Sequence, residues 1–371
     1  RRIGSDKTIR AVERIARTDP RHATHVEAWD ADPMLLNTPG GVVDLATGEV
    51  LPHVQKRLIT RITSVAPGGR CPLWLGFINV ITGGDHELAA YLQRLAGLCL
   101  TGDVSDQAFF FAHGGGANGK SVFILTLAHV LGDYAVTAPL DAFMASKGDR
   151  NSEDLAALRG ARLVSVTETE PGRAWAEARI KQITGGDRIR ARYLYGHYFE
   201  YDPSFKLIIA GNHRPAFAGI SVAMRRRLHL IPFEVTIPPE ERDRRLGEKL
   251  AGEAEGILAW MLEGCAEWSR IGLAPPARVR EASDEYFDDE DHVAGWIHDD
   301  CAVGEGRRAL SSALFDSWSR WAERTGVARG TQSSLRDALK ARGFERWRSG
   351  RGRGWKGIAP RTGPQRVDEE D

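Results

Sequence analysis

Residues 114–121 read Gly114-Gly115-Gly116-Ala117-Asn118-Gly119-Lys120-Ser121, which fits the pattern G-x-x-x-x-G-K-[ST] at every fixed position. Glycines let the backbone N–H groups turn toward a phosphate chain, the lysine reaches the outer phosphates, and the final hydroxyl ligates Mg²⁺. A chain with 40 glycines can also contain such a run as an ordinary turn. The flanking residues favour phosphate binding, because an apolar run precedes the loop and an amphipathic helix follows it. We therefore expect ATP and Mg²⁺ to bind at these eight residues.

Four short apolar runs accompany this loop and predict a buried parallel sheet. They are Ala108–Ala112, Leu163–Val166, Leu207–Ala210 and Leu228–Ile231. Segments with the apolar spacing of helices lie between some of them, around residues 122–131 and 174–184. This alternation predicts an α/β fold with helices on the faces of the sheet, and we place the core domain at residues 106–235.

The rest of the chain divides into three segments. Residues 1–105 combine short strands and glycine-rich turns with helical spacing from Leu73 to Leu100, which predicts an N-terminal domain of small strands and helices. Residues 236–305 predict a helical extension and an acidic linker, since residues 281–300 carry nine acidic side chains and no Lys or Arg. Residues 306–371 predict a basic domain, with nine Lys and Arg between residues 336 and 361.

The composition excludes several classes of protein. The 371 residues carry 50 Lys and Arg against 50 Asp and Glu, which excludes a uniformly basic nucleic-acid coat. No apolar run approaches the roughly 20 residues of a membrane-spanning helix, so we expect no membrane contact. The four cysteines are far apart, which argues against a zinc ribbon or a disulfide scaffold and favours a reducing cytosol. The chain opens without an initiator methionine, so we expect it to be a fragment.

Polar residues follow two of the predicted strands. Leu163–Val166 leads into Glu168, and Glu170 lies two residues further on. An ATPase needs a carboxylate there to hold the metal's water shell and to polarise the attacking water, although a solvated loop also fits. Leu207–Ala210 leads into Asn212, whose amide can bond the γ-phosphate and the attacking water. The stretch from Asn212 to Pro215 also fits an ordinary turn.

Three adjacent arginines, Arg225-Arg226-Arg227, precede the last predicted strand. Such a run is usually a solvated patch. Because it follows the glycine loop, the acidic strand and the asparagine, it is a candidate for an arginine finger that reaches the γ-phosphate of a neighbouring subunit. The candidate catalytic residues are Lys120, Glu168, Glu170, Asn212, Arg226 and Arg227, and the candidate metal ligands are Ser121 and Glu168.

In this order the motifs resemble those of superfamily 3 helicases, and more narrowly the helicase half of phage, plasmid and poxvirus-type primase–helicases. The matching residues are Gly114–Ser121, Glu168–Glu170, Lys181–Asp187, Lys206–Asn212 with Pro215, and Arg226-Arg227 with Pro232-Phe233. The domain that precedes the ATPase in that group is resembled upstream by Leu35–Gly41, Asp44-Leu45 and Pro52-His53, and by Tyr91–Gln93 with Gly97 and Leu100–Gly102.

The resemblance implies an AAA+-like P-loop ATPase core, a hexameric ring and ATP-driven translocation on single-stranded DNA. It also implies a role in replicating a phage or mobile element in the cytoplasm of a bacterial host. The chain contains no primase carboxylate cluster, so any primase domain would lie upstream of Arg1.

Two departures from the pattern of that group leave alternatives open. Thr169 separates the two glutamates, so either can activate water, and either Arg226 or Arg227 can be the finger.

Residues 187–200 alternate basic and apolar side chains around Tyr195-Gly196, which predicts a β-hairpin. Arginine, tyrosine and histidine near its tip suit phosphate contacts and base stacking on a single strand. In similar helicases such a hairpin projects into the ring channel, whereas a hairpin packed on its own domain through Tyr193 and Phe199 is the alternative. The candidate DNA contacts of this region are Lys181, Arg190, Arg192, Tyr195 and His197.

The C-terminal residues predict helices at 310–324 and 331–342, followed by two strands around a Gly/Arg turn. This pattern fits a winged-helix-like module that docks on duplex or forked DNA. Its candidate DNA contacts are Arg346, Arg348, Arg351 and Arg353. The alternative is a solvated basic face.

Three functions fit these motifs. They are an ATP-dependent hexameric DNA helicase, an ATP-dependent DNA-binding assembly factor or packaging motor that does not unwind, and a P-loop kinase. A kinase needs a compact acceptor site and a lid. The arginine run, the strand-end asparagine and the basic tail favour a ring motor instead, and the helicase is the leading hypothesis.

Overall fold

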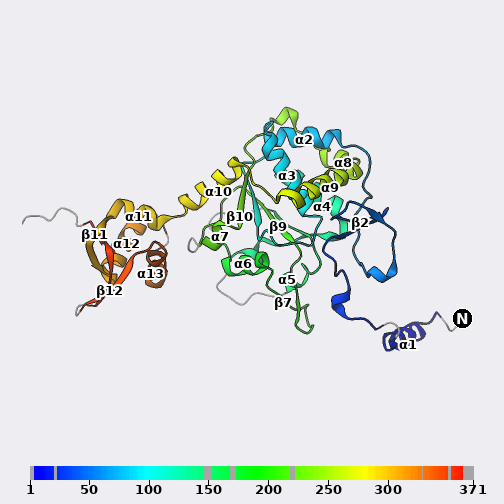
Figure 1. Ribbon diagram of the computed structural model, residues 1–371, viewed down its shortest axis with the longest axis horizontal. Helices are drawn as coiled ribbons and strands as arrows, with labels where there is room; N and C mark the ends of the chain where they lie inside the picture. Colours follow the sequence, from blue (N-terminus) through cyan, green and yellow to red (C-terminus); the bar gives the residue numbers. More distant parts are fainter. Residues whose placement is uncertain are drawn as a thin grey trace, which may run out of the picture.

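The structure is a computed structural model that describes residues 4–20, 23–145, 153–167, 173–217, 222–327, 329–349 and 352–361. A larger α/β body and a smaller C-terminal module are joined by helix α10 (Ala277–Asp289), as Figure 1 shows. Helix α1 (Asp6–Arg17) lies apart from both, with no buried residue.

A five-stranded parallel sheet forms the centre of the larger body, in the order β10-β4-β9-β6-β5. Its strands are β4 (Phe109–His113), β5 (Ala135–Thr137), β6 (Leu163–Thr167), β9 (Lys206–Gly211) and β10 (Leu228–Pro232). The four apolar runs of the sequence form four of these strands, and β5 is an additional edge strand. The predicted α/β fold is therefore confirmed.

Helices cover both faces of the sheet. Successive residues of a strand point to opposite faces, so each strand contributes side chains to two cores. Phe110 and Ala112 of β4 pack into one core with α2 (Pro72–Thr82), α3 (His86–Leu98), α4 (Lys120–Leu131), α8 (Leu246–Ala251) and α9 (Ala254–Ile271). Phe109 and Phe111 pack into a second core with α5 (Glu153–Ala156), α6 (Glu177–Gly185), α7 (Val222–Arg225) and α10. The sheet is the middle of three layers.

On the first face, helices from before and after the sheet pack against each other. The backbones of α3 and α9 touch at two glycines: a Cβ at Gly97 would overlap the backbone of Gly264 and Cys265, and one at Gly264 would overlap Gln93. Residues 72–98 therefore share a core with α4, the helix that follows the glycine loop. The boundary that we predicted at residue 105 does not separate two cores.

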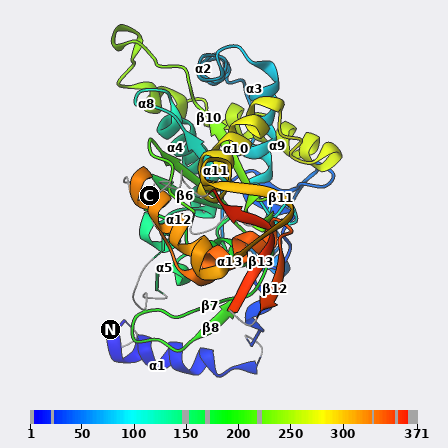
Figure 2. The same cartoon turned by 90° about the vertical axis from the view of Figure 1, so that its left-hand side faces the viewer.

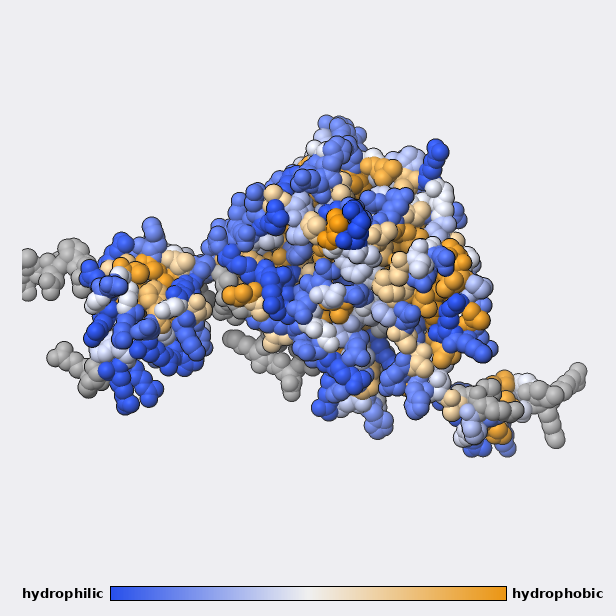
Figure 3. Space-filling model, viewed as in Figure 1, coloured by the Kyte–Doolittle hydropathy of each residue, from blue (hydrophilic) through white to orange (hydrophobic). Residues whose placement is uncertain are grey.

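The N-terminal residues form a small antiparallel sheet of β1 (Leu35–Thr38), β2 (Gly41–Asp44) and β3 (Val50–Leu51). The sequence analysis did not predict α1, which begins after Ser5, whose hydroxyl accepts a hydrogen bond from the N–H of Thr8. Ile9, Val12 and Ile15 of α1 are exposed. In the view of Figure 3, hydrophilic residues cover most of the visible surface, and apolar residues gather on the side of the N-terminal strands.

The C-terminal module consists of α11 (His292–Asp300), β11 (Cys301–Leu310), α12 (Ser311–Thr325), α13 (Gln332–Ala341), β12 (Glu345–Ser349) and β13 (Gly352–Pro360). Both predicted helices and the two-stranded wing are present, and β11 adds a third strand. The module has its own core, which includes Trp296 and Cys301. It thus begins near Asp291 rather than at residue 306. The acidic residues that we assigned to a linker lie largely on α10 and α11.

The predicted hairpin consists of β7 (Ile189–Ala191) and β8 (Phe199–Tyr201), paired antiparallel. It extends from the lower side of the larger body in both views (Figures 1 and 2).

Candidate nucleotide site and nucleic-acid surfaces

The glycine loop, residues 114–121, joins β4 to α4 at the carboxyl edge of the sheet. Within the described part of the chain, the backbone N–H groups of Gly115 through Ser121 donate no hydrogen bond. Two glycines are required sterically. A Cβ at Gly114 would overlap the carbonyl oxygen of Phe233, and one at Gly119 would overlap the side chain of Ile81. Open N–H groups at the start of a helix are suited to binding phosphate.

The buried side chain of Lys120 folds back over this loop. Its Nζ donates to the carbonyl oxygens of Gly114 (2.6 Å) and Gly115 (2.8 Å), and to Oδ1 of Asn118 (2.9 Å) and Asn212 (3.1 Å). Burial lowers the pKa of this amine. Asn118 also donates Nδ2 to the carbonyl oxygen of Phe233 (2.8 Å). The lysine therefore holds the loop closed through oxygens that phosphate oxygens can replace.

Asn212 lies directly beyond β9, at the same edge of the sheet, because His113 of β4 pairs with Gly211 of β9. His113 lies beside the lysine. Burial, together with the charges of Arg214 and Lys120, lowers the pKa of His113 to about 4, although a hydrogen bond with the backbone of Asn212 acts in the opposite direction. The imidazole is therefore neutral at pH 7.

The candidate metal ligands come from two elements. Ser121 is exposed in the first turn of α4. Thr167 ends β6 opposite Ala210 of β9, so the chain leaves β6 at the edge where Asn212 lies. Glu168 and Glu170 follow, but both lie outside the described residues, and their roles stay predictions. Among the residues that the structure describes, no group of three or more His, Cys, Asp or Glu is placed to hold a metal ion. A hydroxyl and a carboxylate are oxygen ligands that suit Mg²⁺.

The arginine run lies at the opposite edge of the sheet. It precedes β10, which runs parallel to β4, so the length of a five-residue strand, roughly 16 Å, separates it from the glycine loop. Arg227 is 6% exposed and donates to Oγ1 of Thr184 (3.1 Å), the carbonyl oxygen of Ala223 (2.9 Å) and Oε1 of Gln107 (3.2 Å).

Arg226 is exposed and contacts Oε1 of Gln107 at 3.4 Å. The sequence left the choice between Arg226 and Arg227 open. The geometry favours Arg226 as the finger, because Arg227 is buried and held by three partners of its own chain. The strand that separates the run from the glycine loop also means that a finger from this run would serve another copy of the chain.

The hairpin combines a packed base with a free tip. Tyr193 stacks on Phe199 (ring centroids 5.3 Å apart) and donates to the carbonyl oxygen of Ala156 (3.3 Å), so the base packs on its own domain. At the tip, Tyr195 is 99% exposed. The guanidinium groups of Arg190 and Arg192 lie 4.4 and 4.9 Å from the ring centre of Tyr198.

Two further hairpin-region candidates differ in their surroundings. His197 is exposed near the tip. Lys181 belongs to α6, where its Nζ pairs with Glu177 at 3.3 Å. The partner reduces the charge that Lys181 offers to a nucleic acid.

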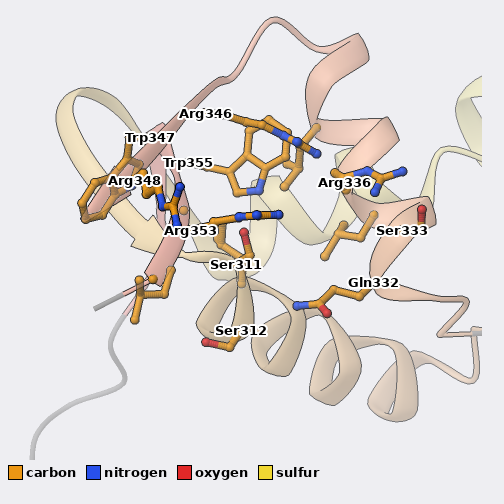
Figure 4. Close-up of a pocket in the computed structure, with 16 residues that line it drawn as sticks. Ser311, Ser312, Gln332, Ser333, Arg336, Arg346, Trp347, Arg348, Arg353 and Trp355 are labelled. Atoms are coloured by element: carbon orange, nitrogen blue, oxygen red, sulfur yellow. The ribbon is translucent and has the colours of Figure 1, made fainter. Parts of the chain in front are cut away.

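A groove of about 820 Å³ lies between α12, α13 and the wing of the C-terminal module. Its lining residues include Ser311, Ser312, Gln332, Arg336, Arg346, Arg348, Arg353 and Trp355, and no acidic residue. In Figure 4, Arg346 and Arg353 point from the wing toward α13, which presents Gln332 and Arg336. The guanidinium of Arg346 lies 5.4 Å from the centre of the Trp355 ring. Arg351 lies outside the described residues. Three of the four predicted arginines thus share one basic groove.

Three residues of these sites were not predicted from the sequence. Gln107 contacts both Arg226 and Arg227, His113 borders Lys120, and Arg214 lies two residues beyond Asn212. The position of His113 at the end of an apolar strand, directly before the glycine loop, could have indicated it. Gln107 carries no such signal, because its role depends on contacts about 120 residues away.

Comparisons with known proteins match separate parts of the chain. Residues 1–83 match the family described as "D5 N terminal like", and residues 112–227 match a "family of unknown function (DUF5906)". The chain is also similar to the "Putative helicase L207/L206" of Acanthamoeba polyphaga mimivirus, with 29% identity over 232 aligned residues. That similarity covers 57% of this chain and 24% of the mimivirus protein, so the chain spans about a quarter of its length.

Among solved structures, an A-form apo structure of the NrS-1 C-terminal region has a TM-score of 0.49 at 11% identity, covering 95% of this chain and 90% of that chain. A second apo structure, of NrS-1 residues 305–718, has a TM-score of 0.48 at 11% identity, covering 94% and 90%. None of the helices in the described ranges is long and apolar enough to span a bilayer.

Proposed function

We propose that this chain is the motor part of an ATP-dependent DNA helicase, which hydrolyses ATP in a hexameric ring and moves along single-stranded DNA. The observation that carries the proposal is the contact between Lys120 and Asn212 beside a loop of open N–H groups. The similarity to the mimivirus protein supports a helicase. We place its work in replication of a phage or mobile element in the host cytoplasm, with a primase domain upstream.

In this proposal the phosphates of ATP take the place of the four oxygens that surround the amine of Lys120. Neutral oxygens give way to charged ones, which bond an ammonium group more strongly. Asn212, released from Lys120, is free to bond the γ-phosphate and the attacking water. Ser121, with Glu168 or Glu170, would hold Mg²⁺, which neutralises charge on the outer phosphates. The remaining glutamate would accept the proton of the water.

The position of Arg226 supports action between subunits. The residue is exposed at the edge of the sheet opposite the glycine loop, so it cannot reach the nucleotide of its own chain. A head-to-tail arrangement of copies would bring Arg226 of one copy to the loop of the next, and such contacts form a ring when the rotation between copies closes. The arginine then stabilises charge that develops on the γ-phosphate.

Two surfaces suit DNA and suggest different roles. The hairpin tip offers exposed arginine, tyrosine and histidine, which suit stacking and phosphate contacts on a single strand. The groove of the C-terminal module offers four arginines without a carboxylate in its lining, which suits the phosphates of a duplex or fork.

The test is ATP hydrolysis with and without single-stranded DNA. The proposal expects turnover that DNA stimulates and that Lys120→Ala abolishes. Turnover that is indifferent to DNA, or that persists in Lys120→Ala, would contradict it.

A further inference from the structure

The connection from β9 to β10, residues 212–227, carries Asn212 at one end and Arg226 at the other. The proposed function places both residues on the γ-phosphate, Asn212 in its own subunit and Arg226 in the neighbour. Helix α10 contacts this connection along much of its described length. The same helix leads directly into the C-terminal module.

The end of α10 holds the part of the connection next to Asn212. Arg214 pairs with Asp289 (3.3 Å), and its guanidinium lies 5.6 Å from the ring centre of Tyr286. The hydroxyl of Tyr286 donates to the carbonyl oxygen of Pro215, and the backbone N–H of Phe217 donates to Glu290 (3.1 Å). Asn212 is thus two residues away from a segment that α10 fixes.

The middle of α10 holds the part next to Arg226. The guanidinium of Arg225 binds two carboxylates at once, Asp284 at 3.1 Å and Asp288 at 2.8 Å, and lies 5.2 Å from the ring centre of Phe287. The two aspartates raise the pKa of Arg225 further. The two carboxylates lie about one helical turn apart on α10. The arginine that they bind directly precedes Arg226.

The contacts of α10 are of two kinds. Tyr286 and Phe287 are fully buried and pack the helix on the second core. The ion pairs of Arg214 and Arg225 lie at the surface, where such pairs are weak and individually reversible. Beyond α10, Asp291 caps α11 and binds Arg342 of the C-terminal module. The stretch of chain that carries the partners of Arg214 and Arg225 therefore continues directly into the C-terminal module.

We propose that Arg214 and Arg225 are positioning residues, through which α10 sets Asn212 and Arg226 according to the state of the C-terminal module. The inference rests on the proposed function. Binding of DNA to the module shifts the end of α10 and with it the connection, so that one movement adjusts the site of this subunit and the finger offered to the next. In this way DNA binding to the C-terminal module is coupled to the nucleotide site.

The experiment compares full-length wild type with Arg225→Gln and with the double variant Asp284→Asn/Asp288→Asn. We measure kcat and KM for ATP with and without forked DNA. Without DNA, kcat is expected to stay within about twofold of wild type. The stimulation of kcat by DNA is expected to fall at least about fivefold, the lower range of allosteric coupling, with KM and DNA affinity unchanged. Arg225→Lys, which retains the charge, should restore part of the stimulation.

Arg278→Gln is the matched control. Arg278 also lies on α10 and pairs with Glu234 (2.6 Å) and Asp85 (3.5 Å), which lie outside the connection. It should keep wild-type stimulation. Equal loss in Arg278→Gln, or full stimulation in both test variants, overturns the inference while the proposed function stands. A wild-type protein whose ATP turnover does not respond to DNA overturns both.

Discussion

The amine of Lys120 lies 3.1 Å from Oδ1 of Asn212, so the glycine loop and the end of β9 meet in one hydrogen bond. The two residues are 92 positions apart in the sequence, and the pairing of β4 with β9 brings them together. In the proposed function, the bond links the residue that binds the phosphates of ATP to the residue that orients the attacking water. The proposed function has phosphate oxygens replace the present partners of Lys120, so it expects ATP binding to release Asn212 from this bond.

This hydrogen bond predicts that two substitutions of Asn212 affect different steps, one ATP turnover and the other ATP binding. Asn212→Ala should leave ATP affinity within about threefold and lower kcat about 100-fold, as loss of one oriented polar group does. Asn212→Asp should weaken ATP binding at least about tenfold, because the carboxylate pairs with Lys120 and repels the γ-phosphate. Titration with a fluorescent ATP analogue measures both affinities. Equal affinities for wild type and Asn212→Asp would show that the hydrogen bond to Lys120 does not matter for binding.

The two candidate finger arginines should behave differently. Arg226→Ala should fold normally and bind ATP, yet lower the activity of rings mixed with wild type by more than its fraction. Arg227→Ala should lower the free energy of unfolding by about 1–3 kcal/mol, because it removes the donor to Oγ1 of the buried Thr184, whose hydroxyl then keeps only its bond to the carbonyl oxygen of Ile180. Urea unfolding and mixed-ring ATPase assays measure these effects. Activity that falls in proportion to the fraction of Arg226→Ala would argue against a finger shared between subunits.

The buried side chain of His229 predicts how the free energy of unfolding depends on pH. Burial lowers the pKa of His229 to about 4, and its Nδ1 shares a 2.6 Å hydrogen bond with the hydroxyl of Tyr91. The unfolded chain therefore binds a proton between pH 6.5 and 4 that the folded chain does not, so the free energy of unfolding falls as the pH drops through this window. The full effect is roughly 3 kcal/mol.

His229→Gln retains a partner for Tyr91 and does not titrate, so its stability should depend less on pH over this window. His113, whose pKa is lowered in the same direction, keeps part of the dependence. Urea midpoints at about pH 7, 5.5 and 4.5 compare the two proteins. Parallel curves would mean that His229 is protonated without cost in the folded chain.

The groove of the C-terminal module predicts a change in salt dependence. Substitution of Arg346, Arg348 and Arg353 by Gln should reduce the slope of log affinity against log salt on forked DNA. The expected reduction is about 0.9 for each phosphate that the variant no longer neutralises. Arg307 and Arg320 are exposed in the same module outside the groove lining, and their substitution by Gln is the control. An unchanged slope in the triple variant would mean that the groove is a solvated surface.

The sequence predicted those parts of the fold that local patterns determine. Four of the five strands of the sheet are continuous apolar runs, and the glycine loop and Asn212 follow two of them. The boundaries at residues 105 and 306 depended on packing that no local pattern contains: α3 on α9 through Gly97 and Gly264, and Trp296 inside the C-terminal core. The acidic run was interpreted as a linker because its partners, Arg214 and Arg225, lie about 60 to 75 residues upstream.

The choice between Arg226 and Arg227 as the candidate finger could not be predicted from the sequence either. Neighbouring residues of one type are equivalent in a sequence. Their difference here comes from Thr184 and the carbonyl oxygen of Ala223, which bind the buried guanidinium of Arg227 alone. The roles of Glu168 and Glu170 stay predictions.

The central claim is that ATP hydrolysis drives movement of this chain along DNA. The most direct measurement follows ATP turnover and strand displacement together on a forked duplex, for wild type and for Arg192→Ala/His197→Ala. Wild type should displace the strand. The variant should hydrolyse ATP at a comparable rate and displace little, because its hairpin tip lacks groups that hold the single strand. Wild-type protein that hydrolyses ATP on forked DNA and displaces no strand would contradict the claim and indicate an assembly factor or packaging motor instead.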